Sequence, residues 1–115
     1  MRTEIIRLRT GSQETVTDIT GACQEFAAGA AGDGDGLLHV FVPHATAGLA
    51  LIELGSGSDR DLLDVLSRLL PAFVAPFVTL PVVGGRVALG TWQSVALVDL
   101  NVDNRDRQVR LSFLG

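Results

Sequence analysis

The stretch Leu37-Leu38-His39-Val40-Phe41-Val42-Pro43-His44-Ala45-Thr46 decides how this chain can fold. Its first six residues form an apolar run interrupted only by His39, and Pro43 ends it. A run of this length that stops at a proline is typical of a strand buried on both faces of a sheet. The sequence therefore predicts a strand that delivers His44 to the mouth of a loop, beside apolar strands where small-molecule sites are usually built.

The segments before this strand predict two short strands and a helix. Alternating charged and apolar residues over Glu4–Arg9, a turn at Gly11-Ser12 and the segment Glu14–Thr17 indicate an opening strand pair. From Asp18 to Ala30, apolar residues recur every three or four positions, which predicts an amphipathic helix with Thr17 or Asp18 able to cap its start. The glycine-rich segment 29–36 then ends the helix and forms a loop.

The segments after Thr46 add a second helix and most of the strands. Ala47–Leu54 is a further apolar strand, and a leucine stripe that follows Ser56-Gly57-Ser58-Asp59 predicts a second helix ended by Pro71. Four later segments rich in Val and Leu are predicted as a meander of strands: Val78–Val83, Arg86–Leu89, Ser94–Leu100 and Val109–Phe113. The predicted fold class is α+β, a mixed, mostly antiparallel sheet or sandwich with two helices packed on one face.

Composition limits the classes of protein to which the chain can belong. Its 115 residues suffice for one compact domain, taken as residues 1–115, and 47% of them are hydrophobic. The formal net charge is −4, and the nine basic residues are scattered arginines without a stripe that could follow nucleic acid. Few aromatics in an aliphatic core favour self-association. Cys23 stands alone, which excludes an intrachain disulfide, and we expect a cytoplasmic protein without a membrane span.

His44 and Glu53 are the main candidates for chemistry. His44 could bind a metal or shuttle a proton, or it could simply bond to a nearby turn. Glu53 interrupts an apolar segment, so it needs a partner, a metal or a raised pKa if it is buried, or it lies at the solvent edge. We expect the two side chains to be partners. His39 is predicted to face the opposite way from His44 and to share no metal with it.

Three further motifs are weaker. Gly55-Ser56-Gly57-Ser58 could offer backbone N–H groups to a phosphate, but the acidic residues that follow favour a helix cap. Asp99–Asp103 resembles the start of a calcium loop, yet Asn104 and Arg110 replace the required glycine and glutamate, so we reject that site. Trp92 is expected to be core, interface or pocket wall.

These motifs together resemble those of the YjbQ family, whose members are often labelled secondary thiamine-phosphate synthase enzymes. The resemblance is carried by Val42–Gly48, Glu53, the Arg60–Leu63 helix, Leu80–Arg86 and Leu89–Gln93, which occur in the family's order. It implies a homotrimer with a site near the subunit boundaries. It also implies roles for particular residues: His44 and Glu53 as ligands of a divalent metal ion or as catalytic groups, and Thr46, Thr91, Trp92 and Gln93 as substrate-binding residues.

The chain also departs from the family pattern. Ala45 replaces the first threonine of the family's Pro-His-Thr-Thr segment, and Ile52 replaces the asparagine common before the glutamate. A Gly, His and Asn-rich segment that would bring a second histidine is absent after Pro71. Either the protein lacks this segment or the sequence omits a mobile loop, which we favour; an intact mass of 12.1 kDa would contradict the second explanation.

Two functions therefore stand side by side. One is a transferase of the thiamine-phosphate synthase type, with weak or side activity, that joins a pyrimidine pyrophosphate to a thiazole phosphate. The other is a non-catalytic oligomeric module that holds a small phosphorylated ligand or a metal in the same pocket. The substitutions at positions 45 and 52 favour the second slightly.

Overall fold

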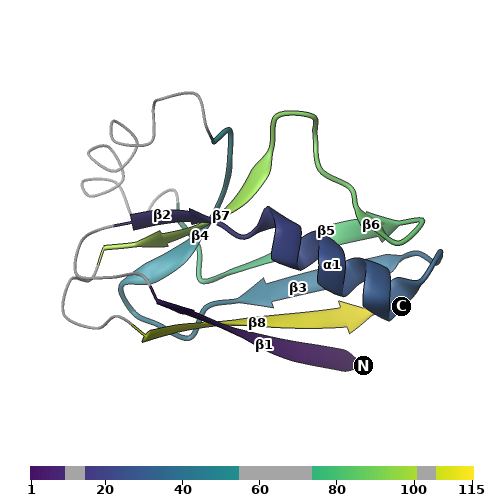
Figure 1. The fold of residues 1–115 in the computed structure, drawn as a ribbon, viewed down its shortest axis with the longest axis horizontal. Coiled ribbons are helices and arrows are strands. Elements are labelled where there is room, and N and C mark those ends of the chain that lie inside the picture. The colour runs from purple at the N-terminus through teal and green to yellow at the C-terminus, as the bar shows by residue number, and fades with distance from the viewer. Residues whose placement is uncertain (10–14, 55–73, 101–105) are drawn as a thin grey trace.

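The computed structural model describes residues 1–9, 15–54, 74–100 and 106–115, which contain one helix and eight strands (Figure 1). The elements are β1 (Arg2–Arg9), β2 (Thr15–Asp18), α1 (Thr20–Ala31), β3 (Gly36–Phe41), β4 (Ala47–Ile52), β5 (Phe77–Val83), β6 (Arg86–Val87), β7 (Ser94–Asp99) and β8 (Asp106–Leu114). The second predicted helix, over residues 56–70, lies outside the described residues, as does the glycine-serine segment before it. Within the described part of the chain no helix is long and apolar enough to cross a membrane.

The strands form two antiparallel sheets. The larger has the order β1-β8-β3-β5-β6 and the smaller has the order β2-β7-β4. The predicted pairing of the first two strands is wrong, because β1 pairs with β8 over eight positions and β2 pairs with β7 in the other sheet. The predicted C-terminal meander holds only for β5 and β6, since β7 and β8 lie in different sheets. Apart from the hairpin of β5 and β6, the strands thus pair with strands distant in sequence, and propensity alone does not identify such a partner.

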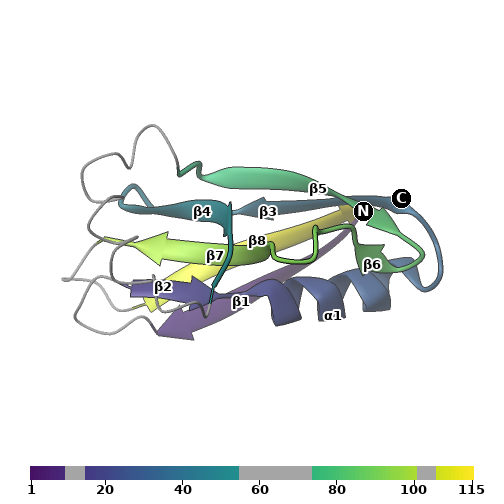
Figure 2. The ribbon, with the colours of Figure 1, turned by 90° about the horizontal axis from the view of Figure 1, so that it is seen from above.

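The core lies between two layers. One layer is the five-stranded sheet, and the other consists of α1 together with the three-stranded sheet, both packed on the same face (Figures 1 and 2). Buried residues of the helix and of both sheets form one hydrophobic cluster that includes Phe26, Leu38, Leu49, Leu97 and Leu111. The predicted α+β character with an antiparallel sheet is confirmed.

Helix α1 was predicted almost to its ends. The N-cap residue is Ile19, without a side-chain cap bond, and not Thr17 or Asp18 as predicted. The Asp18 Oδ1 atom still accepts a hydrogen bond from the Thr20 N–H at 2.9 Å, which helps to satisfy the first turn. The helix buries Cys23, Phe26 and Ala27 against the sheets. Burial, together with the nearby Asp18 carboxylate, raises the pKa of the Cys23 thiol to about 12. The lone cysteine is therefore an uncharged core residue rather than a nucleophile.

Strand β3 differs from expectation on one face. Leu38 and Val40 are fully buried, but Leu37 and Phe41 are 45% and 37% exposed. The apolar run predicted burial on both faces, and this is wrong for the chain taken alone, because nothing in the described residues covers the side opposite α1. We call this side of the five-stranded sheet the outer face.

Candidate functional site

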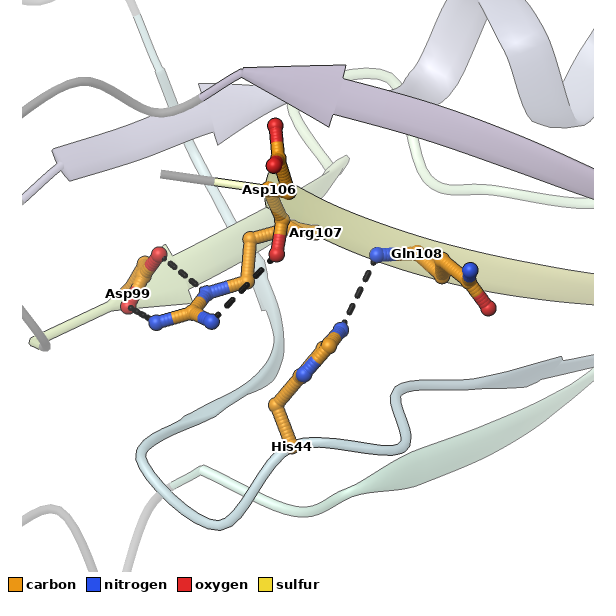
Figure 3. A network of polar contacts seen from close by, with 5 residues as sticks. All are labelled: His44, Asp99, Asp106, Arg107 and Gln108. Carbon is orange, nitrogen blue, oxygen red and sulfur yellow. Dashed lines mark hydrogen bonds and ion pairs between the residues drawn. The ribbon is translucent and has the colours of Figure 1, made fainter. Parts of the chain in front are cut away.

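The imidazole of His44 accepts a hydrogen bond from β8 at the position where the backbone of β3 would accept it if that strand continued. Strand β3 ends at Phe41, which pairs with Arg110 of β8, and the chain then turns away. The next backbone N–H group of β8 on that side, that of Gln108, donates a hydrogen bond of 2.9 Å to Nε2 of His44 (Figure 3). Because Nε2 accepts this bond, the neutral ring carries its proton on Nδ1. The alternative that His44 bonds to a nearby turn is therefore wrong, because its partner lies 64 residues away on strand β8. Nδ1–H remains available to a ligand.

The surroundings of His44 favour its neutral form. Its pKa is lowered, first by desolvation and then by the positive charge of Arg107, while the carboxylate of Asp99 opposes the shift. The imidazole is thus uncharged near neutral pH, as the bond from Gln108 requires.

Beneath His44 lies a buried ion pair. Arg107 is 2% exposed and Asp99 is fully buried. Nε of Arg107 donates to Oδ2 of Asp99 at 2.6 Å, and a second guanidinium nitrogen donates to Oδ1 at 3.2 Å (Figure 3). This two-point contact joins β7 of the small sheet to β8 of the large sheet. It also fixes the strand on which Gln108 and one wall of the site are carried.

A cavity of about 340 Å³ opens beside these groups. Its lining residues come from β1, β8 and the loop after β3: Arg7, Leu8, Arg9, His44, Asp106, Arg107 and Gln108. Arg9 and Asp106 form an ion pair of 3.7 Å between two highly exposed side chains, which contributes little to stability. Three guanidinium groups, the His44 imidazole and the Asp106 carboxylate therefore line the cavity.

This donor set suits an anion better than a metal ion. The Nε2 lone pair of His44 is already engaged, and the three arginines that line the cavity outnumber its one carboxylate, Asp106. Among the described residues, no group of three or more His, Cys, Asp and Glu side chains could hold a metal ion. Guanidinium groups match phosphate oxygens in shape and charge. The residues that line the cavity therefore do not fit the divalent metal ion that the resemblance implies.

Glu53 does not reach His44 within one chain. In the ladder between β4 and β7, Ala47 pairs with Asp99 and Ile52 pairs with Ser94. His44 precedes β4 and Glu53 follows it, so the six residues of the strand, about 20 Å at roughly 3.4 Å per residue, separate them. Thr46 lies at the His44 end, where its carbonyl oxygen accepts a 3.1 Å hydrogen bond from the Leu100 N–H, but it does not line the cavity.

The turn before β7, which contains Gly90, Thr91, Trp92 and Gln93, lies at the Glu53 end. The Gln93 side-chain oxygen accepts a 2.8 Å bond from the Gly90 N–H, and the Gln93 N–H donates to the Gly90 carbonyl at 3.0 Å. Thr91 and Gln93 line a second cavity of about 420 Å³. Trp92 is 73% exposed, so it is not a core residue. The predicted site residues thus form two groups at opposite ends of one ladder.

Sequence reasoning overlooked the arginines and Asp99. Arg107 shares its side of β8 with the buried residues Val109, Leu111 and Phe113, and a charge in an inward position of an alternating strand is a readable signal. Asp99, singled out only as part of a rejected calcium loop, ends the buried run of β7. The involvement of Arg7 and Arg9 depends on the pairing of β1 with β8, which the sequence does not specify.

Comparison with known proteins identifies the family. The family model described as UPF0047 protein YjbQ-like matches residues 4–74 and 71–115, and the matches meet where the resemblance predicts a further segment. The UPF0047 protein Rv2556c of Mycobacterium tuberculosis is 47% identical, over 99% of this chain and 98% of its own length. A crystal structure of the hypothetical protein APE1520 from Aeropyrum pernix has a TM-score of 0.87 at 30% identity and covers 100% of this chain and 99% of its own.

An uncharacterised YjbQ/UPF0047 protein from Clostridium acetobutylicum has a TM-score of 0.83 at 23% identity, over 96% of this chain and 99% of its own, and shares the fold. The family expected from the sequence is confirmed: the chain belongs to the YjbQ (UPF0047) family.

Proposed function

We propose that this protein binds a small phosphorylated ligand in the cavity beside His44, as a subunit of a homotrimer. The observation that carries the proposal is the donor set: a neutral imidazole with Nδ1–H available, beside Arg7 and Arg9 in a cavity of about 340 Å³. Such a volume lies at the small end of ordinary ligand pockets.

Each group has a distinct role in this proposal. Arg7 supplies a guanidinium fork for two phosphate oxygens, and the His44 Nδ1–H group donates to a third. Arg107 is held by Asp99, so it contributes positive charge from a fixed position instead of moving to the ligand. Thr46 lies two residues beyond His44 and outside the cavity lining, so it is proposed to contact only a part of the ligand that extends beyond the cavity.

The second group of residues is proposed to come from a neighbouring subunit. Because Glu53 and Trp92 lie at the far end of the ladder from His44, only another copy can bring them to the same ligand. A head-to-tail contact of this kind joins different surfaces of identical chains and closes into a ring. A homotrimer would then contain three equivalent sites.

A phosphate-binding experiment tests the proposal directly. Titration of inorganic phosphate by calorimetry should show binding by the wild type and at least about a tenfold loss in Arg7→Ala and His44→Ala, since one charge-assisted contact is worth about 1.5–3 kcal/mol. Arg86→Ala removes an exposed arginine that lines the other cavity and should leave the affinity unchanged.

Two results would contradict this function. One is a wild type that binds no phosphate at millimolar concentration. The other is a titration in which Mg²⁺ or Zn²⁺ binds more tightly than phosphate and loses affinity in His44→Ala, because that result would make the cavity a metal site.

Catalysis is a separate claim on the same site. Both substrates of the thiamine-phosphate synthase reaction carry phosphate groups, and an arginine-lined cavity could stabilise the pyrophosphate that leaves. We propose Glu53 and His44 as the catalytic pair of that reaction, supplied by different subunits. If so, the His44→Ala protein and the Glu53→Gln protein are each inactive. When the two variants are mixed and allowed to exchange subunits, some sites combine an intact His44 from one subunit with an intact Glu53 from the other, and thiamine phosphate formation returns. If the wild type forms no thiamine phosphate, the transferase hypothesis is wrong and the protein is a non-catalytic binding module.

A further inference from the structure

We propose that the ligand of the His44 cavity is a phosphate monoester that also carries an ammonium group, and that Asp106 is the residue that selects it. The inference rests on the proposed function, because it assigns a chemical class to the phosphorylated ligand of that cavity. The arguments for it are the position of one carboxylate among the arginines and the balance of charge when different ligands bind.

Asp106 is the only carboxylate among the described side chains that line the cavity. It belongs to β8 and lies directly opposite Arg9 of β1, and the next pair on the same face is Gln108 and Arg7. Leu8, between the two arginines, packs on the core, so both arginines point to the outer face. Diagonal neighbours on paired strands lie about 7–8 Å apart. Asp106 and Arg7 are therefore close enough to contact the two ends of one small ligand.

The contact between Arg9 and Asp106 is of a kind that a ligand replaces easily. Nε of Arg9 lies 3.7 Å from Oδ1 of Asp106, longer than an ordinary hydrogen bond, and the two side chains are 82% and 84% exposed. An exposed pair of this kind contributes little to stability. The contact between Arg107 and Asp99, in contrast, is buried and consists of two shorter bonds. Arg9 is thus the arginine that can change partners when a ligand enters.

A ligand that carries both kinds of charge leaves the cavity balanced. A phosphate monoester has up to two negative charges, which match the positive charges of Arg7 and Arg9. When Arg9 turns to the phosphate, an ammonium group on the ligand takes the place of that guanidinium beside the Asp106 carboxylate. An ester without a positive group binds the same two arginines but leaves one net negative charge there, and its phosphate is repelled by Asp106.

Calorimetric titrations with two esters of similar size test the inference. Aminoethyl phosphate carries the ammonium group, and propyl phosphate has a methyl group in its place. At low salt and about pH 8, the wild type should bind aminoethyl phosphate about two- to fivefold more tightly, the range for one exposed ion pair. In Asp106→Asn the preference should vanish, because aminoethyl phosphate binds more weakly and propyl phosphate binds more tightly without the repelling charge.

Two further variants and one further ligand complete the experiment. Asp33→Asn removes a carboxylate from an exposed position beyond α1 and should keep the preference of the wild type. Arg9→Gln should weaken the binding of both esters, because the inference assigns Arg9 to the phosphate group. Glycerophosphoethanolamine, a diester with the ammonium group of a lipid headgroup but only one negative charge, should bind more weakly than aminoethyl phosphate. Circular dichroism melting confirms that each variant is folded.

The outcomes separate this inference from the proposed function. If the wild type binds both esters equally, or if Asp106→Asn keeps the preference for aminoethyl phosphate, the ligand class is wrong although phosphate binding stands. A diester that binds as tightly as the monoester, or an Arg9→Gln protein with the affinities of the wild type, would also overturn the inference. If neither ester binds the wild type at millimolar concentration, the proposed function fails together with it.

Discussion

The two ends of the paired strands β4 and β7 differ in whether a single chain forms a cavity there with polar groups around it. At the His44 end, a buried ion pair, an imidazole bonded to a strand and several arginines enclose a cavity within one chain (Figure 3). At the Glu53 end, the turn before β7 is closed by Gln93, while Trp92 projects into solvent. The first end has the features of a ligand site, and the second has those of a surface that awaits a partner. The difference shows that residues of one sequence motif set can lie at opposite ends of a pair of strands.

Breaking the ion pair at the His44 end should give the largest effect. Asp99→Asn leaves the buried Arg107 guanidinium without its countercharge, and the free energy of unfolding should fall by about 3–5 kcal/mol. Urea unfolding followed by circular dichroism measures this change. Asp33→Asn, an exposed position beyond α1, is the control and should stay within about 0.5 kcal/mol of the wild type. Equal urea midpoints for the two variants would contradict a structural role for the pair.

Acid should weaken the same end through His44. Because the folded state lowers the pKa of His44, the unfolded chain takes up the proton first, and stability is lost as the pH falls from about 6.5 through the lower folded value. His44→Gln offers an oxygen to the Gln108 N–H group and does not titrate, so its melting temperature should decrease less between pH 7.5 and pH 5. Parallel melting curves for the two proteins over this range would argue against the neutral imidazole.

The turn at the Glu53 end should tolerate more. Gln93→Ala removes one exposed side-chain hydrogen bond to Gly90, and we expect a loss of about 0.5–1 kcal/mol, near the low end for a single bond. Urea unfolding of Gln93→Ala and Asp99→Asn under the same conditions compares the losses of unfolding free energy at the Glu53 end and at the His44 end. A loss as large as that of Asp99→Asn would show that the turn is as essential as the ion pair.

Trp92→Ala should have the smallest effect on the folded chain. Since 73% of the residue is exposed, the unfolding free energy of the subunit should change by no more than about 0.5 kcal/mol. If the indole lies between subunits, the assembled mass measured by sedimentation falls even though the subunit is as stable as before. A marked loss of subunit stability would mean that the indole packs inside its own chain.

The sequence predicted individual elements better than their partners. The sequence pattern located α1, β3 and β4 to within two residues. The apolar residues of α1 recur every three or four positions, and β3 and β4 are short apolar runs. It could not pair β1 with β8, which lies about a hundred residues away, so the arginines of β1 were not associated with His44. Glu53 was assigned as the partner of His44 from chemical type alone. The separation of the two residues follows from the length of β4, Ala47–Ile52.

Cys23 gives the protein a built-in reporter. As the only cysteine, it has no exposed surface, and its thiol stays protonated at ordinary pH. A thiol reagent can therefore reach it only when α1 separates from the sheets, so the labelling rate counts those opening events without any engineered probe. Labelling with and without phosphate would test whether a ligand of the arginine-lined cavity changes how often α1 separates from the sheets.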